Sequence, residues 1–325
     1  MKRVPPELLD FIDRHGTFYV VGHKEPDGDC VGSQLALASF LRRNGKDVFP
    51  LSAGPFTRTE ILSYEHRFTD IAPAERASER AAAIILDCSS LQRIGSVAET
   101  LPSVPLAFID HHASGEASGE VVFIDDRAPA VTLMVLALIE AMGQKPTKEE
   151  AELLLFGLIT DTGFFRHLDE GSAETFAAAS RLVAAGASPK RGFSMMYGGK
   201  SLYSRKLMGE ILTRTEPYFE DRLLISYVTL DDQQRYGLAS RDSDMLYQLL
   251  MSVAGCEAAM IIRQERETDC TVGLRARDRV DVGSIAAVFG GGGHRLAAGL
   301  SIRGRIEDVR DRLLEAFAPA FADLD

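Results

Sequence analysis

Two short runs of the chain are apolar at every position, and they constrain the fold more than any other feature of the sequence. These runs cover residues 82–86 and 105–109. An unbroken apolar run of this length is typical of a strand that is covered on both faces. Further β-rich runs and helical stretches alternate along the first half of the chain, with strands expected at 17–22 and 48–51 and helices at 30–43, 130–142, 149–158 and 172–185. This alternation predicts a mostly parallel α/β sheet.

The second half of the chain repeats the β-α pattern on a smaller scale. A break at 186–189 is followed by a polar helical stretch at 201–215, and strands resume at about residue 223. A length of 325 residues suits two domains at about 150 residues each. We predict an α/β fold with a larger N-terminal domain over 1–187, a helical linker over 188–217 and a smaller C-terminal α/β domain over 218–325.

The composition of the chain limits the kinds of molecule that the protein can be expected to bind. The chain is 46% hydrophobic and 26% charged, which is ordinary globular usage, and its net charge is -11. Such an acidic protein is a poor binder of long nucleic-acid duplexes and of anionic membranes. The four cysteines show no C-x-x-C spacing, and we see neither a signal peptide nor a membrane span. We therefore expect a cytoplasmic protein without membrane or duplex partners.

Histidine and aspartate side chains follow the predicted strands at the points where the strands end. His23, Asp27 and Asp29 come after the first strand, and Asp87 follows the next apolar run. Another set follows the run at 105–109, namely Asp110, His111 and His112, and Asp161 lies just past an apolar helix. Because ligands bind outside the carboxyl ends of the strands in open α/β sheets, we expect these side chains to meet at one edge.

Each of these residues has an ordinary structural explanation when it is taken singly. An aspartate after a strand is usually a turn former or a helix N-cap, and a histidine there is usually a satisfied surface residue. Together, several carboxylates at one edge would repel one another without cations among them. Mixed His/Asp ligation suits two Mn²⁺ or similar ions better than a thiolate zinc site. Two such ions are the usual arrangement for hydrolysis of a phosphate ester.

A tract of four glycines is the second landmark. Residues 290–293 are all glycine and His294 follows directly, while Arg275, Arg277, Arg279 and Arg295 lie nearby in the sequence. Glycines let the backbone approach a ligand closely, and their amides bind anions. The alternatives are a flexible turn for the glycines and a solvated strand edge for the arginines. The combination predicts a surface that binds a phosphate or a nucleotide.

These motifs together resemble the DHH superfamily of phosphoesterases, in the two-domain branch that has a DHH-associated C-terminal domain. That branch contains the NrnA-type nanoRNase/pAp phosphatases and the stand-alone cyclic di-AMP and linear dinucleotide phosphodiesterases. The resemblance covers nearly the whole chain and rests on five segments: His23-x-x-x-Asp27-x-Asp29-x-x-Gly32-Ser33, Asp87, Asp110-His111-His112, Asp161-Thr162-Gly163, and Gly290–His294 with Gly299.

The resemblance implies a role for each site residue. One metal ion would be held by His23, Asp27 and Asp87, and the other by Asp29, Asp87, His111 and Asp161, with Asp87 bridging. Asp110 would orient an imidazole, and His112 would contact the scissile phosphate. The substrate-binding residues would be Gly291, Gly292, Gly293, His294, Arg275 and Arg166. One departure concerns Arg275-Ala276, where family members commonly have Arg-Ser, so that a hydroxyl contact is missing.

The implied activity is a metal-dependent phosphodiesterase or phosphatase that uses two Mn²⁺ ions, with Mg²⁺ or Co²⁺ as alternatives. Its expected substrates are RNA oligomers of two to five nucleotides, linear or cyclic dinucleotides such as pApA and cyclic di-AMP, and pAp. An inorganic pyrophosphatase or exopolyphosphatase of the same superfamily is one alternative, and a non-catalytic nucleotide sensor is another. The oligomeric state is left open, with a homodimer among the options.

Overall fold

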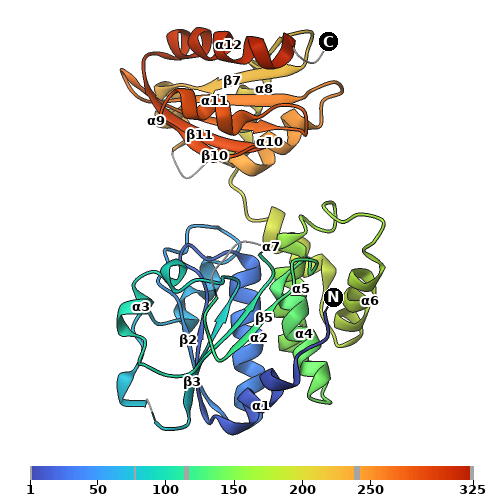
Figure 1. The fold of residues 1–325 in the computed structure, drawn as a ribbon. Coiled ribbons are helices and arrows are strands. Elements are labelled where there is room, and N and C mark those ends of the chain that lie inside the picture. The colour runs from blue at the N-terminus through green and yellow to red at the C-terminus, as the bar shows by residue number, and fades with distance from the viewer. Residues whose placement is uncertain (1, 77, 113–116, 238–241, 323–325) are drawn as a thin grey trace. The chain divides into compact units, whose positions relative to one another are not determined.

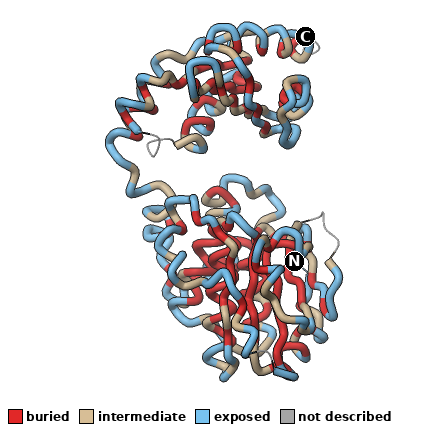
Figure 2. The backbone as a smooth tube through the Cα atoms, turned by 90° about the vertical axis from the view of Figure 1, so that its left-hand side faces the viewer, coloured by how far each residue is buried: buried red, intermediate tan, exposed pale blue. Residues whose placement is uncertain are grey.

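The computed structural model describes residues 2–76, 78–112, 117–237 and 242–322 (Figure 1). The chain divides into two compact units, Met1–Gly198 and Gly199–Asp325. Each unit has its own sheet and its own buried core, which Figure 2 shows in red. Within the described residues, no helix combines the length and the apolar character that crossing a membrane requires. A separate core in each unit is what defines a domain physically.

The sheet of the first unit has five strands, and every pair of neighbours is parallel. Its strands are β1 (Thr17–Val21), β2 (Asp47–Leu51), β3 (Ala81–Leu86), β4 (Leu106–Asp110) and β5 (Val121–Ile124). The predicted parallel α/β sheet is confirmed, and its four predicted strands lie where the apolar runs placed them. β5 was not predicted, although all four of its residues are apolar.

The order of these strands fixes where a ligand can bind. The order is β2-β1-β3-β4-β5, so the chain moves to one side of the sheet after β1 and to the other side after β3. A crevice opens at the carboxyl ends of strands where the strand order reverses in this way, and ligands bind there. In this sheet the reversal lies between β1 and β3. The residues that follow these two strands therefore occupy the position in the sheet that is best suited to a ligand.

The longer helices cover one face of the sheet, and short helices lie on the other face. Alternate strand residues such as Val20 and Ile84 pack in one core, and Val21 and Ile85 pack in another on the opposite face. The first core is built with five longer helices: α1 (Pro6–Arg14), α2 (Gly28–Arg43), α4 (Val131–Ala141), α5 (Lys148–Asp161) and α6 (Ala173–Ala184). The second core is smaller and includes residues of η3 (Leu91–Ile94) and α3 (Val97–Thr100). Burial on both faces explains why these strands are continuously apolar.

Glycines allow α2 and α5 to pack unusually close together. A Cβ atom on Gly32 would lie 2.6 Å from the carbonyl oxygen of Leu153, and one on Gly157 would lie 2.4 Å from Cγ2 of Thr132 and 3.0 Å from the Cα atom of Asp29. Real Cβ atoms essentially never make contacts shorter than 3.0 Å, so these positions hold no side chain. The close packing brings the start of α2, which carries Asp29, beside α5, which ends at Asp161.

The second unit is a six-stranded, mostly antiparallel sheet in the order β10-β11-β9-β8-β7-β6. Its strands are β6 (Glu216–Tyr218), β7 (Leu223–Val228), β8 (Ala258–Arg266), β9 (Asp269–Ala276), β10 (Gly292–His294) and β11 (Ala297–Arg303). α11 (Val282–Val288) and α12 (Ile306–Ala322) pack in one core. A second core contains residues of α8 (Leu202–Thr213), α9 (Leu230–Tyr236) and α10 (Ser243–Met251). This is the α/β C-terminal fold expected from the sequence.

The segment at 188–217 contains two helices that belong to different units. α7 (Pro189–Tyr197) lies in the first unit, and α8 contributes Leu207 and Ile211 to a core of the second. The structure divides the chain between them, at Gly198–Gly199. The domain bounds 1–187, 188–217 and 218–325 stay a prediction about the limits of independently folding parts.

Candidate metal centre

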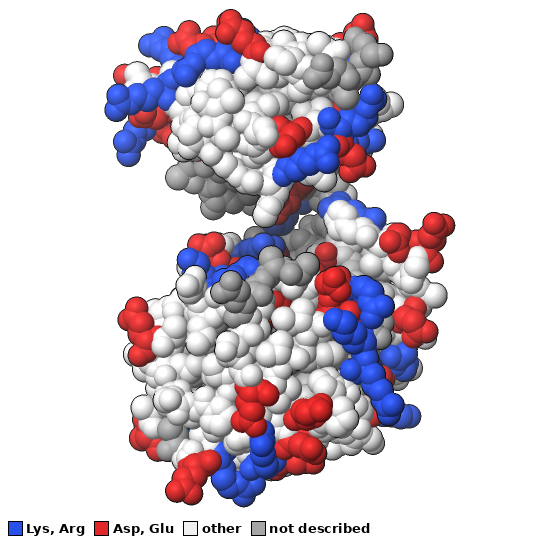
Figure 3. Space-filling model, in the orientation of Figure 1, with Lys and Arg blue, Asp and Glu red and all other residues white. Residues whose placement is uncertain are grey.

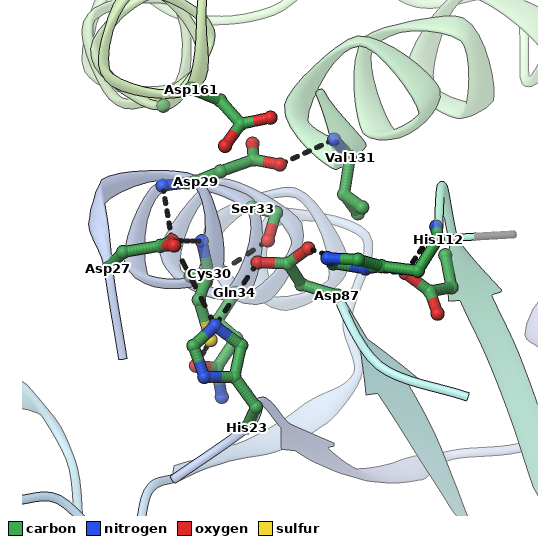
Figure 4. A network of polar contacts seen from close by, with 12 residues as sticks. His23, Asp27, Asp29, Cys30, Ser33, Gln34, Asp87, His112, Val131 and Asp161 are labelled. Atoms are coloured by element: carbon green, nitrogen blue, oxygen red, sulfur yellow. Dashed lines mark hydrogen bonds and ion pairs between the residues drawn. The ribbon is translucent and has the colours of Figure 1, made fainter. Parts of the chain in front are cut away.

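The six residues predicted as metal ligands converge on the edge of the first sheet where the strand order reverses. Figure 4 shows His23, Asp27, Asp29, Asp87 and Asp161 in this cluster. His23 follows β1, Asp87 follows β3 and His111 follows β4, while Asp27 and Asp29 stand at the start of α2. Asp161 is the last residue of α5, and not a residue beyond the helix as the sequence suggested, because α5 continues past 158. Five elements, from four segments of the chain that are distant in sequence, thus supply one cluster.

Asp87 lies at the centre of this cluster, between two histidines. Its Oδ2 atom is 3.4 Å from Nε2 of His23, and its Oδ1 atom is 3.5 Å from Nε2 of His111. His23 Nε2 also lies 3.9 Å from Oδ1 of Asp27, and His111 Nε2 lies 3.7 Å from Oδ2 of Asp161. The two oxygens of one carboxylate therefore face two separate groups of side chains.

The backbone and the burial of Asp87 are both unusual. Its φ angle is +60°, a left-handed conformation that is uncommon for a residue with a side chain. The residue is 2% exposed, and Oδ1 has no hydrogen-bond partner within normal distance. Burial alone would raise the pKa of Asp87, but the adjacent imidazoles of His111 and His23 outweigh burial and lower it to about 2. A buried, ionised oxygen without a donor is a position that a cation would stabilise.

Both histidines present the same ring nitrogen to the cluster. Nδ1 of His23 lies 2.8 Å from the carbonyl oxygen of Lys24, and Nδ1 of His111 lies 3.0 Å from that of Ala128. A carbonyl only accepts, so each Nδ1 carries the hydrogen and each neutral ring keeps a lone pair on Nε2. This is the arrangement in which metal-ligating histidines are commonly held. Burial would lower the pKa of His111, but the nearby carboxylates, with Asp87 foremost, outweigh burial and raise it to about 10. Without an ion, Nε2 of His111 therefore holds a proton, and a metal ion would displace it.

Asp29 and Asp161 form a second group with His111. One ligand atom from each of these three residues lies within 4.8 Å of the others. Burial raises the pKa of Asp161 to about 6, with the charges of Asp87 and Asp27 adding to the effect, and burial also raises the pKa of Asp29. The carboxylates are crowded enough to oppose one another's ionisation, and divalent cations would relieve that repulsion. The donor set of imidazoles and carboxylates fits Mn²⁺ and similar ions.

Asp110 and His112 form a coupled pair beside the cluster. Asp110 is fully buried, and its Oδ1 atom accepts hydrogen bonds from the backbone N–H groups of His111 and His112 at 2.8 and 3.2 Å. The same oxygen lies 2.8 Å from Nδ1 of His112. Although burial opposes it, hydrogen bonding from His112 lowers the pKa of Asp110. Asp110 thereby fixes the imidazole of His112 and leaves its Nε2 atom free.

The predicted substrate residues fall into two places. Arg166 is exposed and lies in the turn after α5, where its Nε atom is 3.2 Å from Nε2 of His167. In the second unit, Arg275 on β9 and His294 on β10 are both register partners of Ala297 on β11. Directly opposed residues share a face of the sheet, so Arg275 and His294 form one row across three strands.

The glycine tract is a short strand and not the flexible turn that was its alternative. Gly292–His294 pairs with β11 in an antiparallel hairpin. A Cβ atom on Gly293 would lie 2.5 Å from the carbonyl oxygen of Ala297, and one on Gly291 would lie 2.5 Å from that of Gly299. The glycines at 291 and 293 are therefore required by the hairpin itself, while His294 at its end is exposed.

Sequence reasoning missed two side chains at the metal centre. Cys30 lies on the first turn of α2, and one ligand atom from each of His23, Cys30 and Asp87 lies within 4.8 Å of the others. Gln34 lies one turn later and donates from Nε2 to the carbonyl oxygens of Val20 and Leu51, which ties α2 to β1 and β2. The spacing of Cys30 and Gln34, four residues apart on one helix face, was the available signal.

Comparisons with known proteins agree with this geometry. A model of the DHH family N-terminal domain matches residues 17–158, and a model of the DHHA1 domain matches residues 220–323. The chain is 30% identical over 317 residues to the bifunctional oligoribonuclease and PAP phosphatase NrnA of Thermus thermophilus, covering 97% of this chain and 92% of that protein. It is 25% identical to the cyclic-di-AMP phosphodiesterase GdpP of Bacillus subtilis over 97% of this chain and 49% of that protein.

A solved structure shows the same fold. The crystal structure of an exopolyphosphatase-related protein from Bacteroides fragilis superposes with a TM-score of 0.80 at 23% identity, covering 98% of this chain and 97% of the other. The likeness extends over both units of the chain.

Proposed function

The chain belongs to the DHH family of metal-dependent phosphoesterases, and on that premise we propose that it hydrolyses phosphate esters of short nucleotides at the edge of its first sheet. The observation that carries the proposal is the position of Asp87, whose two carboxylate oxygens face two histidines. A carboxylate in this position can bridge two ions. Two bridged ions are the usual requirement for in-line displacement at phosphorus.

We assign the ligands of the two ions from the two groups of side chains. His23, Asp27 and Asp87 would hold one Mn²⁺ ion, and Asp29, Asp87, His111 and Asp161 would hold the other. Mg²⁺ or Co²⁺ would suit the same donors. When bound, the ions supply an activated water and neutralise charge on the phosphate oxygens. Support comes from the unpartnered Oδ1 atom of Asp87, and from the Nε2 atoms of His23 and His111, which face its Oδ2 and Oδ1 atoms respectively.

His112 is proposed to act on the substrate and not on the ions. Its Nδ1 atom is held by Asp110, and its side chain is 38% exposed, so Nε2 is accessible to a phosphate oxygen. A positioned imidazole at this place stabilises the charge that develops in the transition state. Asp110 is then a positioning residue, since it contacts His112 and fixes the tautomer that presents Nε2 outward.

Substrate recognition is proposed to depend on Arg166 of the first unit and on Arg275 and His294 of the second. The row formed by Arg275 and His294 combines a fixed positive charge with a ring that donates and stacks, which suits a phosphate or a base. We propose that Gly291, Gly292 and Gly293 also contribute to this surface.

Short substrates fit the charge of the protein better than long ones. The net charge is -11, and on the face of the first unit drawn in Figure 3, Asp and Glu side chains lie among the Lys and Arg side chains. A long nucleic acid requires a continuous basic track, whereas a small nucleotide needs only one local site. The names of the relatives point to oligoribonucleotides, PAP and cyclic di-AMP. We propose RNA of two to five nucleotides, pApA, cyclic di-AMP and pAp as the candidate substrates.

The test is a comparison of kcat/KM across a panel of substrates with Mn²⁺ present. The panel contains pAp, cyclic di-AMP, pApA and RNA dimers to pentamers, with pyrophosphate and polyphosphate as representatives of the alternative hydrolase activities. We expect turnover of at least one nucleotide substrate, its loss in Asp87→Asn, and normal turnover in Asp10→Asn, which removes an exposed carboxylate on α1. Turnover of pyrophosphate or polyphosphate alone would refute the proposal, as would binding of nucleotides without any hydrolysis.

A further inference from the structure

A thiol lies within the metal centre. Cys30 is fully buried on the first turn of α2, and its Sγ atom lies within 4.8 Å of a ring nitrogen of His23 and of a carboxylate oxygen of Asp87. Figure 4 shows Cys30 on the side of α2 that faces His23. The same group includes the buried carboxylate of Asp87, whose Oδ2 atom lies 3.4 Å from Nε2 of His23. An imidazole nitrogen, a thiol and a carboxylate oxygen that all lie within 4.8 Å of one another mark this side of the centre as a place for a cation.

Among the described residues, the Sγ atom of Cys30 makes one hydrogen bond to a side chain, to Oε1 of Gln34 at 3.5 Å. A Cβ atom on Gly22 would lie 2.2 Å from Sγ, so the absence of a side chain at residue 22 creates the space that Cys30 fills. Gly22 directly precedes His23, and this packing holds the sulfur beside the first proposed metal position.

The other three cysteines are placed differently. Cys88 is buried next to Asp87 in the chain, yet it belongs to no group of metal-ligating atoms among the described residues. Sγ of Cys256 lies 3.3 Å from the carbonyl oxygen of Ala258, and Sγ of Cys270 lies 3.4 Å from that of Gly304. Both of these are hydrogen bonds to the backbone of the second unit. Cys88 offers a matched control, since it is equally buried and lies in the same unit.

We propose that Cys30 makes the His23 side of the centre a site for a thiophilic divalent ion, Zn²⁺ or Cd²⁺, and that such an ion inhibits the enzyme by displacing Mn²⁺. The inference rests on the proposed two-metal function. On binding, the S–H bond breaks, its proton goes to solvent, and a bond forms between sulfur and the ion. His23, Asp27, Asp87 and Cys30 would then supply four ligands of nitrogen, oxygen and sulfur, which is the number of protein ligands in structural zinc sites. Mn²⁺ prefers oxygen and nitrogen and gains little from the sulfur.

The direct test uses Cd²⁺ alone as the probe. The full chain is stripped of metal with a chelator, kept reduced without added thiols, and titrated with Cd²⁺ while the ultraviolet charge-transfer absorption of a cadmium–thiolate bond is recorded. We expect this band to rise to saturation in the wild type and in Cys88→Ser, and to be absent in Cys30→Ser. Cys30→Ala is a second variant in case the serine is not tolerated, and circular dichroism verifies that each variant folds.

A second measurement connects the sulfur to inhibition. Zn²⁺ is added to the Mn²⁺-loaded protein, and each variant is compared with its own uninhibited rate. Loss of one ligand should raise the Zn²⁺ concentration for half-inhibition by at least ~10-fold in Cys30→Ser, and Cys88→Ser should match the wild type. A cadmium–thiolate band that persists in Cys30→Ser would overturn the inference, as would a wild type that binds Mn²⁺ but gives no band. Elemental analysis showing that the wild type binds no metal at all would overturn the proposed function as well.

Discussion

Replacement of Gly157 by alanine tests how strongly the metal centre depends on the packing of α2, α4 and α5. A Cβ atom at this position would lie 2.4 Å from Cγ2 of Thr132 and 3.0 Å from Cα and Oδ1 of Asp29. Overpacking of this kind costs about 1–3 kcal/mol, and alanine returns roughly 0.5–1 kcal/mol of helix propensity. We therefore expect Gly157→Ala to lower the free energy of unfolding of the metal-free protein by about 1–2 kcal/mol.

The same substitution should weaken metal binding. To accommodate the methyl group, α5 must move away from Asp29, and Asp161 at the end of α5 moves with it. Asp29 also accepts hydrogen bonds from the backbone N–H groups of Val131 and Thr132 at 2.6 and 2.9 Å, so its carboxylate is not free to follow. We expect Mn²⁺ affinity, measured by calorimetry, to fall by ~10-fold or more, as it does when groups that orient metal ligands are lost.

Gly209→Ala is the matched control for this experiment. Gly209 lies within α8, and a Cβ atom placed on it would meet nothing within 4 Å. This variant should be more stable than the wild type by about 0.5–1 kcal/mol and should bind Mn²⁺ normally. Denaturant titrations followed by circular dichroism give both stabilities. Equal stability of the two variants would contradict the expected effect of packing at Gly157. Mn²⁺ binding by Gly157→Ala that is as tight as binding by the wild type would contradict it too.

Three further outcomes follow from the assigned roles. Asp87→Asn should lose turnover with little change in fold, and turnover within ~10-fold of the wild type would contradict a bridging carboxylate. His294→Ala should mainly raise KM and lower kcat/KM by about 10- to 150-fold, the value of a hydrogen bond to a charged group, while metal content by elemental analysis stays constant. Burial would raise the pKa of Asp232 in the folded state, but Arg214 and Thr229 outweigh burial and lower this pKa. The stability that Asp232 contributes is therefore present above its ordinary value near 3.8 and is lost as the pH falls through the lowered pKa. Melting temperatures across this acid range should fall more steeply in the wild type than in Asp232→Asn, and parallel curves would contradict the assignment.

The sequence predicted the class of the fold and the meeting of the His and Asp side chains at one edge of the sheet because both depend on local patterns. A continuous apolar run indicates a strand that is buried on both faces, and the residue after each run marks the carboxyl end of that strand. The order of the strands was not predictable in this way, since it depends on which strands pair across the sheet. Neither was the antiparallel hairpin at Gly292–His294, whose glycines signal freedom of the backbone but not the strand that constrains it.

Cys30 shows why part of the site escaped prediction. Its position in the sequence predicts that it lies on the first turn of a helix. Whether the sulfur faces the proposed ligands depends on how α2 is rotated against the sheet. That rotation is set by distant contacts, among them the two hydrogen bonds from Gln34 to β1 and β2. The end of α5 is a similar case. Asp161 belongs to the helix because the helix continues through polar residues beyond its last apolar one.

The carboxylates of the candidate centre have structural roles that are compatible with the proposed binding of metal ions. Asp27 caps α2 by accepting from the N–H groups of Asp29 and Cys30, and Asp29 accepts from the first N–H groups of α4. Asp110 accepts from the two residues that follow it. A carboxylate that is fixed by backbone donors loses little further freedom when an ion arrives, so capping prepares it as a ligand or as a support for one. An aspartate that caps the start of a helix is therefore a stronger candidate for a metal ligand, and not a weaker one.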